Sequence, residues 1–306
     1  MTRYLSIRLL LTLITFWVIV TLVFFLLRLA PGGPFDGERR LPPEVEQNLR
    51  VAYNLDQPLP RQYLNYLSML GHGDLGPSFK QKDFSVAELV ISGLPVSLAV
   101  GVMALLIALT GGIALGTWAG LNTGTKTDLL IMGTANIGLA VPAIVVAPLL
   151  ALVFAVWLGW LPAGGIGGPQ YFLLPAAALS LPFVAAIARL TRGSVAETLQ
   201  EPHITTAMAK GLPRRRIIRY HVLPIALLPV LSYIGPAAAA LLTGSVVVEQ
   251  IFELPGIGRY FVQAALNRDY TLVMGVVIVY AAFILLFNLL VDVCYARLDP
   301  RIRLRS

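Results

Sequence analysis

EPHITTAMAKGLPRRRIIRYHVLP, residues Glu201–Pro224, is a polar, arginine-rich segment that separates two long apolar runs. Pro202 suits the first position of a helix, where its missing N–H loses no hydrogen bond. Gly211 can adopt the left-handed conformation that ends a helix, and Pro213 prevents the helix from continuing. The segment is therefore predicted to form two short helices with a break between them.

The first of these helices combines an apolar face with small side chains. Ile204, Ala207 and Met208 recur at helical spacing and are predicted to lie on one face. Small residues occupy positions Thr205, Thr206, Ala207 and Ala209. Because small side chains let another surface approach closely, this pattern is typical of a docking element.

Apolar residues dominate the chain on both sides of this segment. Hydrophobic residues make up 57% and charged residues 13% of the 306 positions, which is unlike a soluble globular protein. Each apolar run approaches or exceeds the roughly 20 residues needed to cross a bilayer core. The sequence predicts an all-α integral membrane protein with six transmembrane helices, at about residues 9–29, 96–119, 129–157, 171–190, 227–248 and 272–295.

The formal charge of +7 comes largely from basic clusters that six spans place on one side of the membrane. These clusters lie near the N-terminus, in segment 189–224, and at the C-terminus, and their terminal members are Arg3, Arg8, Arg297, Arg301, Arg303 and Arg305. The positive-inside rule makes that side cytoplasmic, so both termini are expected there. Such a placement argues against a nucleic-acid-binding function.

Residues 1–95 are expected to form one span and an external subdomain. The first run resembles a signal peptide, but it is longer than a typical apolar region of one and no small-residue cleavage site ends it. An uncleaved span within residues 1–30 is therefore favoured. Segment 31–95 holds eight acidic and six basic residues, which fits the translocated side. Two short helices are predicted within it, in LPPEVEQNLRVAYNL and RQYLNYLSML.

Candidate pore residues lie in two places. Pro142 and Pro148 interrupt the third apolar run, and broken helices often border a translocation path because their freed backbone groups must face a cavity or other protein. Ordinary proline tolerance in a packed bundle is the alternative. ELPGIGRYFVQAALNRDY is predicted to be a turn followed by an amphipathic helix, in which Phe261 and Leu266 are candidate gate residues; a plain interfacial helix is the alternative.

Few ionisable residues occur inside the predicted spans. Asp128 opens the third span and Asp292 lies near the end of the last, and both are interpreted as charges at helix ends. No row of acidic or basic residues suggests a proton relay, and no Walker A loop is present. The sequence therefore predicts a chain with no catalytic residue, no metal site and no bound cofactor.

The Glu201–Pro224 segment resembles the cytoplasmic loop of permease subunits from ATP-binding cassette importers, which has the pattern E-A-A-x3-G-x9-I-x-L-P. Alignment on Gly211 places Thr205, Thr206 and Ala207 at the E-A-A positions and Leu223 and Pro224 at L-P. Thr205, Thr206 and His221 depart from the general pattern, but TAMAKGL is similar to the variant of peptide permeases. Further segments resemble the B-type subunits of oligopeptide importers, among them FFLLRLAPGGPFDGERRLPPEV, VVEQIFELPGIGRYFVQAALNRDY and VDVCYARLDPRIR.

This resemblance implies a role and a set of partners. The chain would be a permease in a bacterial inner membrane, with a transmembrane core at 96–295, a cytoplasmic coupling loop at 191–226 and a cytoplasmic tail at 296–306. Its partners would be a second permease subunit in a heterodimer, two cytoplasmic ATPase subunits, an external substrate-binding protein and the lipid bilayer. The residues implied to contact the ATPase are Thr205, Thr206, Ala207, Ala209, Lys210, Gly211, Leu212, Arg214 and Arg215.

Other functions stay open at this stage. Dipeptides, metal complexes and peptide-like antibiotics are alternative substrates within the same family. An ion-coupled secondary transporter or channel would require intramembrane charges and inverted repeats, which the sequence does not show. An intramembrane protease would require a metal-binding or Ser–His motif within a span, and none occurs.

Overall fold

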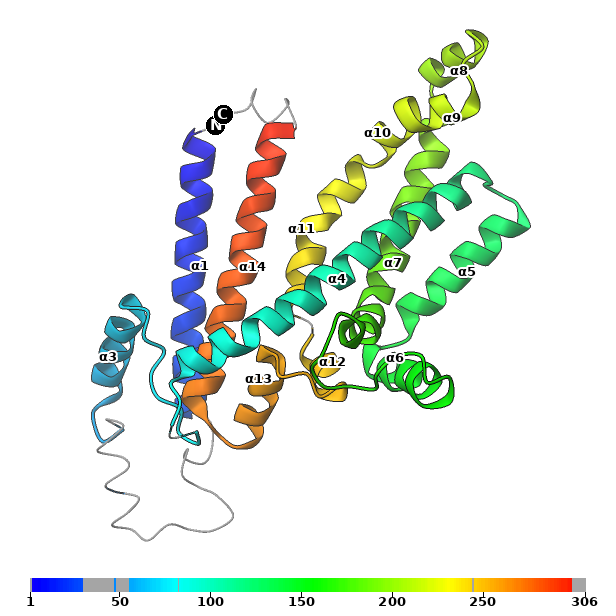
Figure 1. Cartoon of the computed structure of the whole chain (residues 1–306). Coiled ribbons are helices and arrows are strands. Elements are labelled where there is room, and N and C mark those ends of the chain that lie inside the picture. Colours follow the sequence, from blue (N-terminus) through cyan, green and yellow to red (C-terminus); the bar gives the residue numbers. More distant parts are fainter. Residues whose placement is uncertain (1, 30–46, 48–54, 82, 244, 299–306) are drawn as a thin grey trace.

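The computed structural model describes residues 2–29, 47, 55–81, 83–243 and 245–298, and within this part of the chain no β-strand occurs (Figure 1). Five stretches of helix are long and apolar enough to cross a membrane. They lie in α1 (Thr2–Leu29), α4 (Val86–Leu121), α7 (Gln170–Thr198), the pair α11 (Leu228–Thr243) and α12 (Val246–Ile251), and α14 (Tyr270–Leu298). A bent pair of helices brings the number to six if the pair is counted as one span, and the predicted all-α membrane fold is confirmed.

The bent pair lies at the third predicted span, where the chain breaks at a proline. Helix α5 (Lys126–Ala140) ends before Val141, and Pro142 precedes α6 (Ala143–Leu150) in an extended conformation. The π-helix η1 (Ala151–Trp157) continues from α6, and the two halves of the span meet at 106°. A proline has no N–H to donate, so Pro148 inside α6 removes a further helical hydrogen bond. The third region is thus two helices in different directions, and not one kinked rod.

Helices α4 and α7 form the most closely packed pair, and glycines on α4 make the contact possible. Gly112, Gly116 and Gly120 recur every four residues and face α7. A Cβ atom built on Gly116 would lie 2.4 Å from the carbonyl oxygen of Ala188. The small residues of this region therefore bring two backbones together, as expected for membrane helices.

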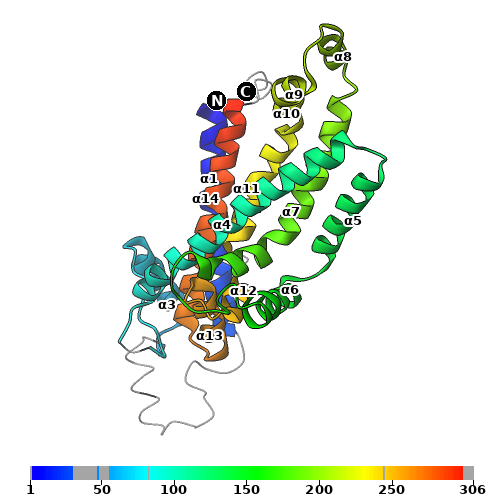
Figure 2. The same cartoon turned by 45° about the vertical axis from the view of Figure 1, so that its right-hand side comes forward.

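Helices α1 and α14 stand side by side, with the start of α1 and the end of α14 at one end of the bundle (Figures 1 and 2). Arg8 of α1 and Asp292 of α14 form an ion pair of 3.1 Å near that end. The chain therefore enters its first span and leaves its last span on one side of the bundle, as an even number of spans requires.

The opposite end of α1 carries the described part of segment 31–95. Helix α3 (Leu59–Gly71) packs against α1, where Phe24 is fully buried and the Thr21 and Tyr63 hydroxyls are 2.7 Å apart. This confirms the helix predicted in RQYLNYLSML. The helix predicted in LPPEVEQNLRVAYNL lies outside the described residues except for Gln47 and Leu55.

Helix α4 begins ten residues before the predicted start of the second span, because a capping box starts it. Ser85 accepts a hydrogen bond from the Glu88 N–H at 3.2 Å, and the Glu88 carboxylate accepts one from the Ser85 N–H at 2.8 Å. Pro95, at the predicted edge, is accommodated inside the helix. Segment 86–95 is therefore the first part of the continuous helix α4.

Candidate functional site

The Glu201–Pro224 segment projects from the bundle at the end where α1 begins and α14 ends (Figures 1 and 2). It forms α8 (Pro202–Ala209), α9 (Arg214–Ile217), the π-helix η2 (Ile218–Val222) and the start of α10 (Leu223–Ala226). The predicted pair of short helices is confirmed, with the second continuing through η2 into the next membrane helix. Pro202 occupies the first turn of α8, as its fixed backbone angle favours.

The break after α8 is closed by two backbone hydrogen bonds. Gly211 has a φ of +75° and donates its N–H to the Met208 carbonyl at 2.9 Å. The Leu212 N–H donates to the Ala207 carbonyl at 3.3 Å, which completes a Schellman motif. Glycine is the residue that adopts this backbone conformation without strain. The direction in which the chain leaves α8 is therefore set by Gly211.

An apolar cluster anchors α8 to the membrane helices. Ile204 and Ala207 are buried there, together with Val195 of α7, Ile217, Val222 and Ala226, and Leu212 packs against them. The cluster joins α8 to both α7 and the helix that leads into α11. A displacement of α8 would therefore be transmitted to two membrane helices at once.

The sequence grouped the small residues of α8 as one approachable surface, and the structure divides them. Ala207 is 6% exposed and faces the apolar cluster, whereas Met208 is 52% exposed and faces outward. The predicted site residues that are exposed are Thr205, Thr206, Ala209, Lys210, Gly211, Arg214 and Arg215. Ala207 and Leu212 instead hold the helix in place. The outer surface of α8 thus combines the small side chains of Thr205, Thr206 and Ala209 with the exposed Met208, and the segment is cationic from Lys210 onward.

The four candidate pore residues lie on two separate helices. Pro142 and Pro148 are exposed at the start of α6 and within it, and α6 packs on α7 and α12. Phe261 and Leu266 belong to α13 (Ile257–Leu266), the amphipathic helix predicted from the sequence. Phe261 packs against the cluster of Val86, Ile257 and Leu272, while Leu266 is 79% exposed at the end of the helix. Both helices lie at the end opposite α8 (Figure 1).

A buried carboxylate that the sequence reasoning missed joins α12 to α13. Glu249 is fully buried and accepts hydrogen bonds from the Ser245 hydroxyl at 2.5 Å and the Gly258 N–H at 2.8 Å. Next to it, Ser97 of α4 accepts a hydrogen bond from the Ile257 N–H at 2.9 Å. An acidic residue alone in the run VVVEQIF was the available signal, because an unpaired charge in an apolar segment needs partners.

A second buried carboxylate fixes the loop after α3 to the start of α14. Asp269 is 1% exposed and accepts hydrogen bonds from the Ser78 hydroxyl and from the N–H groups of Phe79 at 3.2 Å and Leu272 at 3.1 Å. Ser78 and Phe79 lie 191 and 190 residues away in the sequence, so no local pattern identified them. The end of the molecule opposite α8 is thereby held together by two carboxylates.

Asp128 and Asp292 were expected to be charges at helix ends, and both make ion pairs. Asp128 lies in the first turn of α5 and accepts hydrogen bonds from Arg192 of α7 at 2.7 and 3.1 Å and from the Gly124 N–H at 2.9 Å. Asp292 pairs with Arg8. The arginine partners could not be identified from the sequence, because they come from other helices.

Comparison with known proteins identifies the family. Residues 112–304 match the family described as binding-protein-dependent transport system inner membrane component. The oligopeptide transport system permease protein OppB of Escherichia coli K12 is 51% identical over 291 residues, which cover 94% of this chain and 95% of that protein. OppB of Haemophilus influenzae is 48% identical over an alignment that covers 99% of this chain and 100% of that protein. The dipeptide transport system permease protein DppB of Bacillus subtilis is 41% identical over an alignment that covers 100% of this chain and 99% of that protein.

Solved structures agree at the level of the fold. An amino acid ABC transporter chain superposes with a TM-score of 0.55 at 19% identity, covering 76% of this chain and 98% of that chain. A chain of the MetNI methionine ABC transporter in an inward-facing conformation superposes with a TM-score of 0.54 at 20% identity, covering 69% of this chain and 96% of that chain. The chain belongs to the family of binding-protein-dependent transport system inner membrane components.

Proposed function

We propose that this member of the family is one permease subunit of an ATP-binding cassette importer for oligopeptides and forms half of its translocation pathway. The observation that carries the proposal is the 51% identity over 94% of the chain to a protein named as an oligopeptide permease. The relative named as a dipeptide permease is 41% identical, which favours oligopeptides over dipeptides as the substrate class.

The exposed surface of α8 and α9 is the proposed contact with the ATPase subunits. Thr205, Thr206 and Ala209 would allow close approach, and Lys210, Arg214 and Arg215 would make charge-assisted hydrogen bonds to acidic groups of the ATPase. The apolar cluster under Ile204 and Ala207 supports this role, because it couples α8 rigidly to α7 and α10. Rigid-body movement of the ATPase subunits would then reach the membrane helices.

The proposed orientation in the membrane rests on the end of the molecule that carries α8. The start of α1, the end of α14 and α8 lie there, and the basic residues of segment 189–224 gather with them. By the positive-inside rule this end is cytoplasmic, in a bacterial inner membrane. The opposite end, with α3, α12 and α13, would then meet the external binding protein that delivers the peptide. A second permease subunit would complete the pathway, and the chain itself would catalyse no reaction.

A substitution at Gly211 tests the coupling role. Gly211→Asp adds a carboxylate beside the cationic surface and a side chain at a φ of +75°, where space is open for 4 Å around. We expect the transporter to insert and assemble its membrane part, but peptide uptake per ATP hydrolysed to fall by about tenfold or more, because the ATPase movement would no longer be transmitted through α8. Uptake and ATP hydrolysis are measured together in proteoliposomes.

Gly73→Asp is the matched control, because Gly73 has a φ of +77° and equally open surroundings but lies after α3. It carries the same backbone strain without touching the proposed contact, so the ATPase should co-purify normally. Normal peptide uptake by the Gly211→Asp transporter would refute the coupling role. Accumulation of peptide without any ATPase subunit, driven by an ion gradient alone, would instead indicate a secondary transporter.

A further inference from the structure

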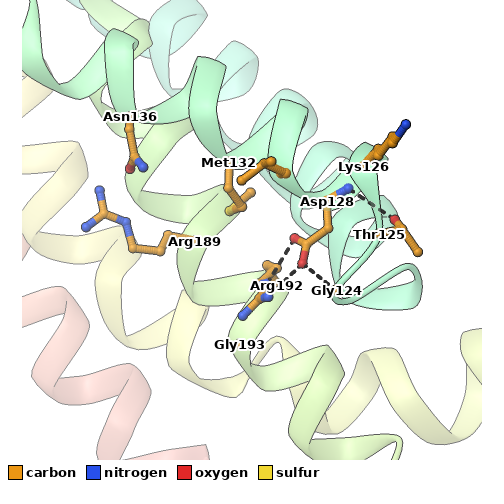
Figure 3. A pocket seen from close by; sticks show the side chains of 10 residues that line it. Gly124, Thr125, Lys126, Asp128, Met132, Asn136, Arg189, Arg192 and Gly193 are labelled. Atoms are coloured by element: carbon orange, nitrogen blue, oxygen red, sulfur yellow. Dashed lines mark hydrogen bonds and ion pairs between the residues drawn. The ribbon is translucent and has the colours of Figure 1, made fainter.

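A cleft of 720 Å³ separates α5 from α7 at the end of the bundle that carries α8 (Figure 3). Its floor is the Asp128–Arg192 ion pair beside the α4–α5 loop. Arg189 and Asn136 extend toward one another from α7 and α5 at its deeper side, and Leu129 and Met132 supply apolar surface. The volume is within the range of about 300–1,000 Å³ that ligand sites occupy.

The cleft carries a net positive charge. Asp128 takes two hydrogen bonds from Arg192, at 2.7 and 3.1 Å, so the charges of this pair cancel. Arg189 and Lys126 are exposed and make no hydrogen bond or ion pair with any residue that the structure describes. Lys126 points away from the cleft at its loop side, whereas Arg189 lies beside Asn136, so Arg189 is the positive charge inside the cleft that is left without a counter-ion and is suited to an anion (Figure 3).

The depth of the charged groups matches that of a lipid headgroup and its glycerol. Lys126 begins α5 at the loop, and Arg189 precedes Arg192 by one helical turn, about 4.5 Å farther into the bundle. Asn136 follows Asp128 by eight residues, which is about 12 Å along α5. Lys126 and Arg192 near the loop already supply the positive charge that the positive-inside rule associates with the cytoplasmic side. That rule does not explain why Arg189 lies one turn deeper, beside Asn136.

The surroundings of the cleft are apolar and face outward. Leu129 is 75% exposed, Leu130 68% and Ile137 64%, all on α5, which lies at the margin of the molecule (Figure 2). A soluble anion would leave this surface uncovered, whereas acyl chains would cover the part of it that the second permease subunit does not contact. We propose that the cleft binds the phosphate of an anionic phospholipid, with Arg189 on the phosphate, Asn136 on the glycerol, and Leu129 and Met132 against the acyl chains. Basic pockets between membrane helices bind such headgroups.

The test measures lipid binding to the complete transporter, assembled with its second permease and ATPase subunits. Native mass spectrometry in detergent follows the titration of dioleoyl phosphatidylglycerol, with dioleoyl phosphatidylcholine as the zwitterionic probe. Arg189→Gln removes the deep charge and Arg189→Lys retains it. Arg61→Gln, an exposed arginine of α3 at the opposite end, removes the same charge elsewhere.

We expect wild type to bind phosphatidylglycerol more tightly than phosphatidylcholine at its tightest site. Arg189→Gln should weaken phosphatidylglycerol binding about fivefold, since a basic residue at the membrane surface is worth about 1 kcal/mol. Arg189→Lys and Arg61→Gln should both stay within about twofold of wild type. Retention by Arg189→Lys would show that the charge matters and that the fold is intact.

Several results would overturn the proposal. Equal binding of the two lipids would show that the site does not select an anion, and equal loss in Arg189→Gln and Arg61→Gln would show that the cleft is not the site. Displacement of phosphatidylglycerol by soluble glycerol 3-phosphate would assign the cleft to a free anion. Displacement by an oligopeptide with a free carboxylate would assign it to the transported substrate.

Discussion

Replacement of Gly116 by alanine is expected to push α4 away from α7. The added Cβ would lie 2.4 Å from the Ala188 carbonyl oxygen, 2.6 Å from the Thr191 Cβ and 2.9 Å from the Ala188 Cα. Two of these three atoms belong to the α7 backbone and cannot rotate away. Ordinary contacts of a Cβ begin at about 3.4 Å, so the helices would have to separate locally by about 1 Å. The tightest interface of the fold would then lose its packing.

The magnitude follows from two opposing effects. Overpacking costs about 1–3 kcal/mol, and a rigid backbone neighbour favours the upper end of that range. Alanine in place of glycine inside a helix regains about 1 kcal/mol. We therefore expect Gly116→Ala to lower the free energy of unfolding by about 2 kcal/mol.

Gly111→Ala is the matched control on the same helix. Its Cβ would meet only the Val184 methyl groups, at 3.7 and 3.8 Å, which is ordinary van der Waals contact. It should leave stability unchanged or raise it by up to about 1 kcal/mol through helix propensity. The free energy of unfolding of Gly116→Ala should thus be about 2–3 kcal/mol lower than that of Gly111→Ala.

The assay is a titration of the purified transporter with sodium dodecyl sulfate in mixed micelles, followed by tryptophan fluorescence. Trp118, two residues after Gly116 and 59% exposed, is the tryptophan of α4 among the four of the chain. Equal unfolding midpoints for Gly116→Ala and Gly111→Ala would refute the reasoning, because the close approach of the two backbones would then have no energetic effect. A midpoint of Gly116→Ala above that of wild type would refute it as well.

Two further predictions concern the buried carboxylates. Glu249→Ala leaves the buried Gly258 N–H without its acceptor, so we expect it to lower the free energy of unfolding by about 1–3 kcal/mol. The control Gln250→Ala, at an exposed position, should change it by less than about 0.5 kcal/mol. Equal effects of the two variants in the same titration would contradict this. Asp269→Ala should release the 76–81 loop from the start of α14 and speed amide exchange of Phe79 and Leu272 by about tenfold or more, with Asn267→Ala as the exposed control. Unchanged exchange in Asp269→Ala would show that the loop is held by other contacts.

Local patterns predicted the elements of this fold well. The all-α membrane class, the short helices around Gly211 and the amphipathic helix after LPGIG are all set by residues close together in the sequence. Pro202, Gly211 and Pro213 act through their own backbone angles, so their effect can be seen without the rest of the chain. The same holds for the break at Pro142, although its angle of 106° could not be derived.

The contacts that organise the site were less accessible. Ala207 looked like part of an approachable small surface, and only the apolar cluster with Val195 and Val222 shows that it faces inward. The spacing of Met208 places it on the same helical face as Ile204 and Ala207, but Met208 is exposed and does not belong to the apolar cluster. Which small residue faces a partner depends on where neighbouring helices pack, and spacing along one helix does not determine that.

The sequence by itself determined that this chain crosses a membrane as helices and carries a polar, cationic segment between its spans. Hydropathy, charge placement and the conformational limits of proline and glycine are local properties, so they are encoded locally. Only the tertiary structure decided that Arg192 neutralises Asp128 while Arg189 pairs with no residue that the structure describes, and that Glu249 and Asp269 hold the opposite end together. Those outcomes depend on distances between helices far apart in the sequence, and such distances exist only once the helices have packed.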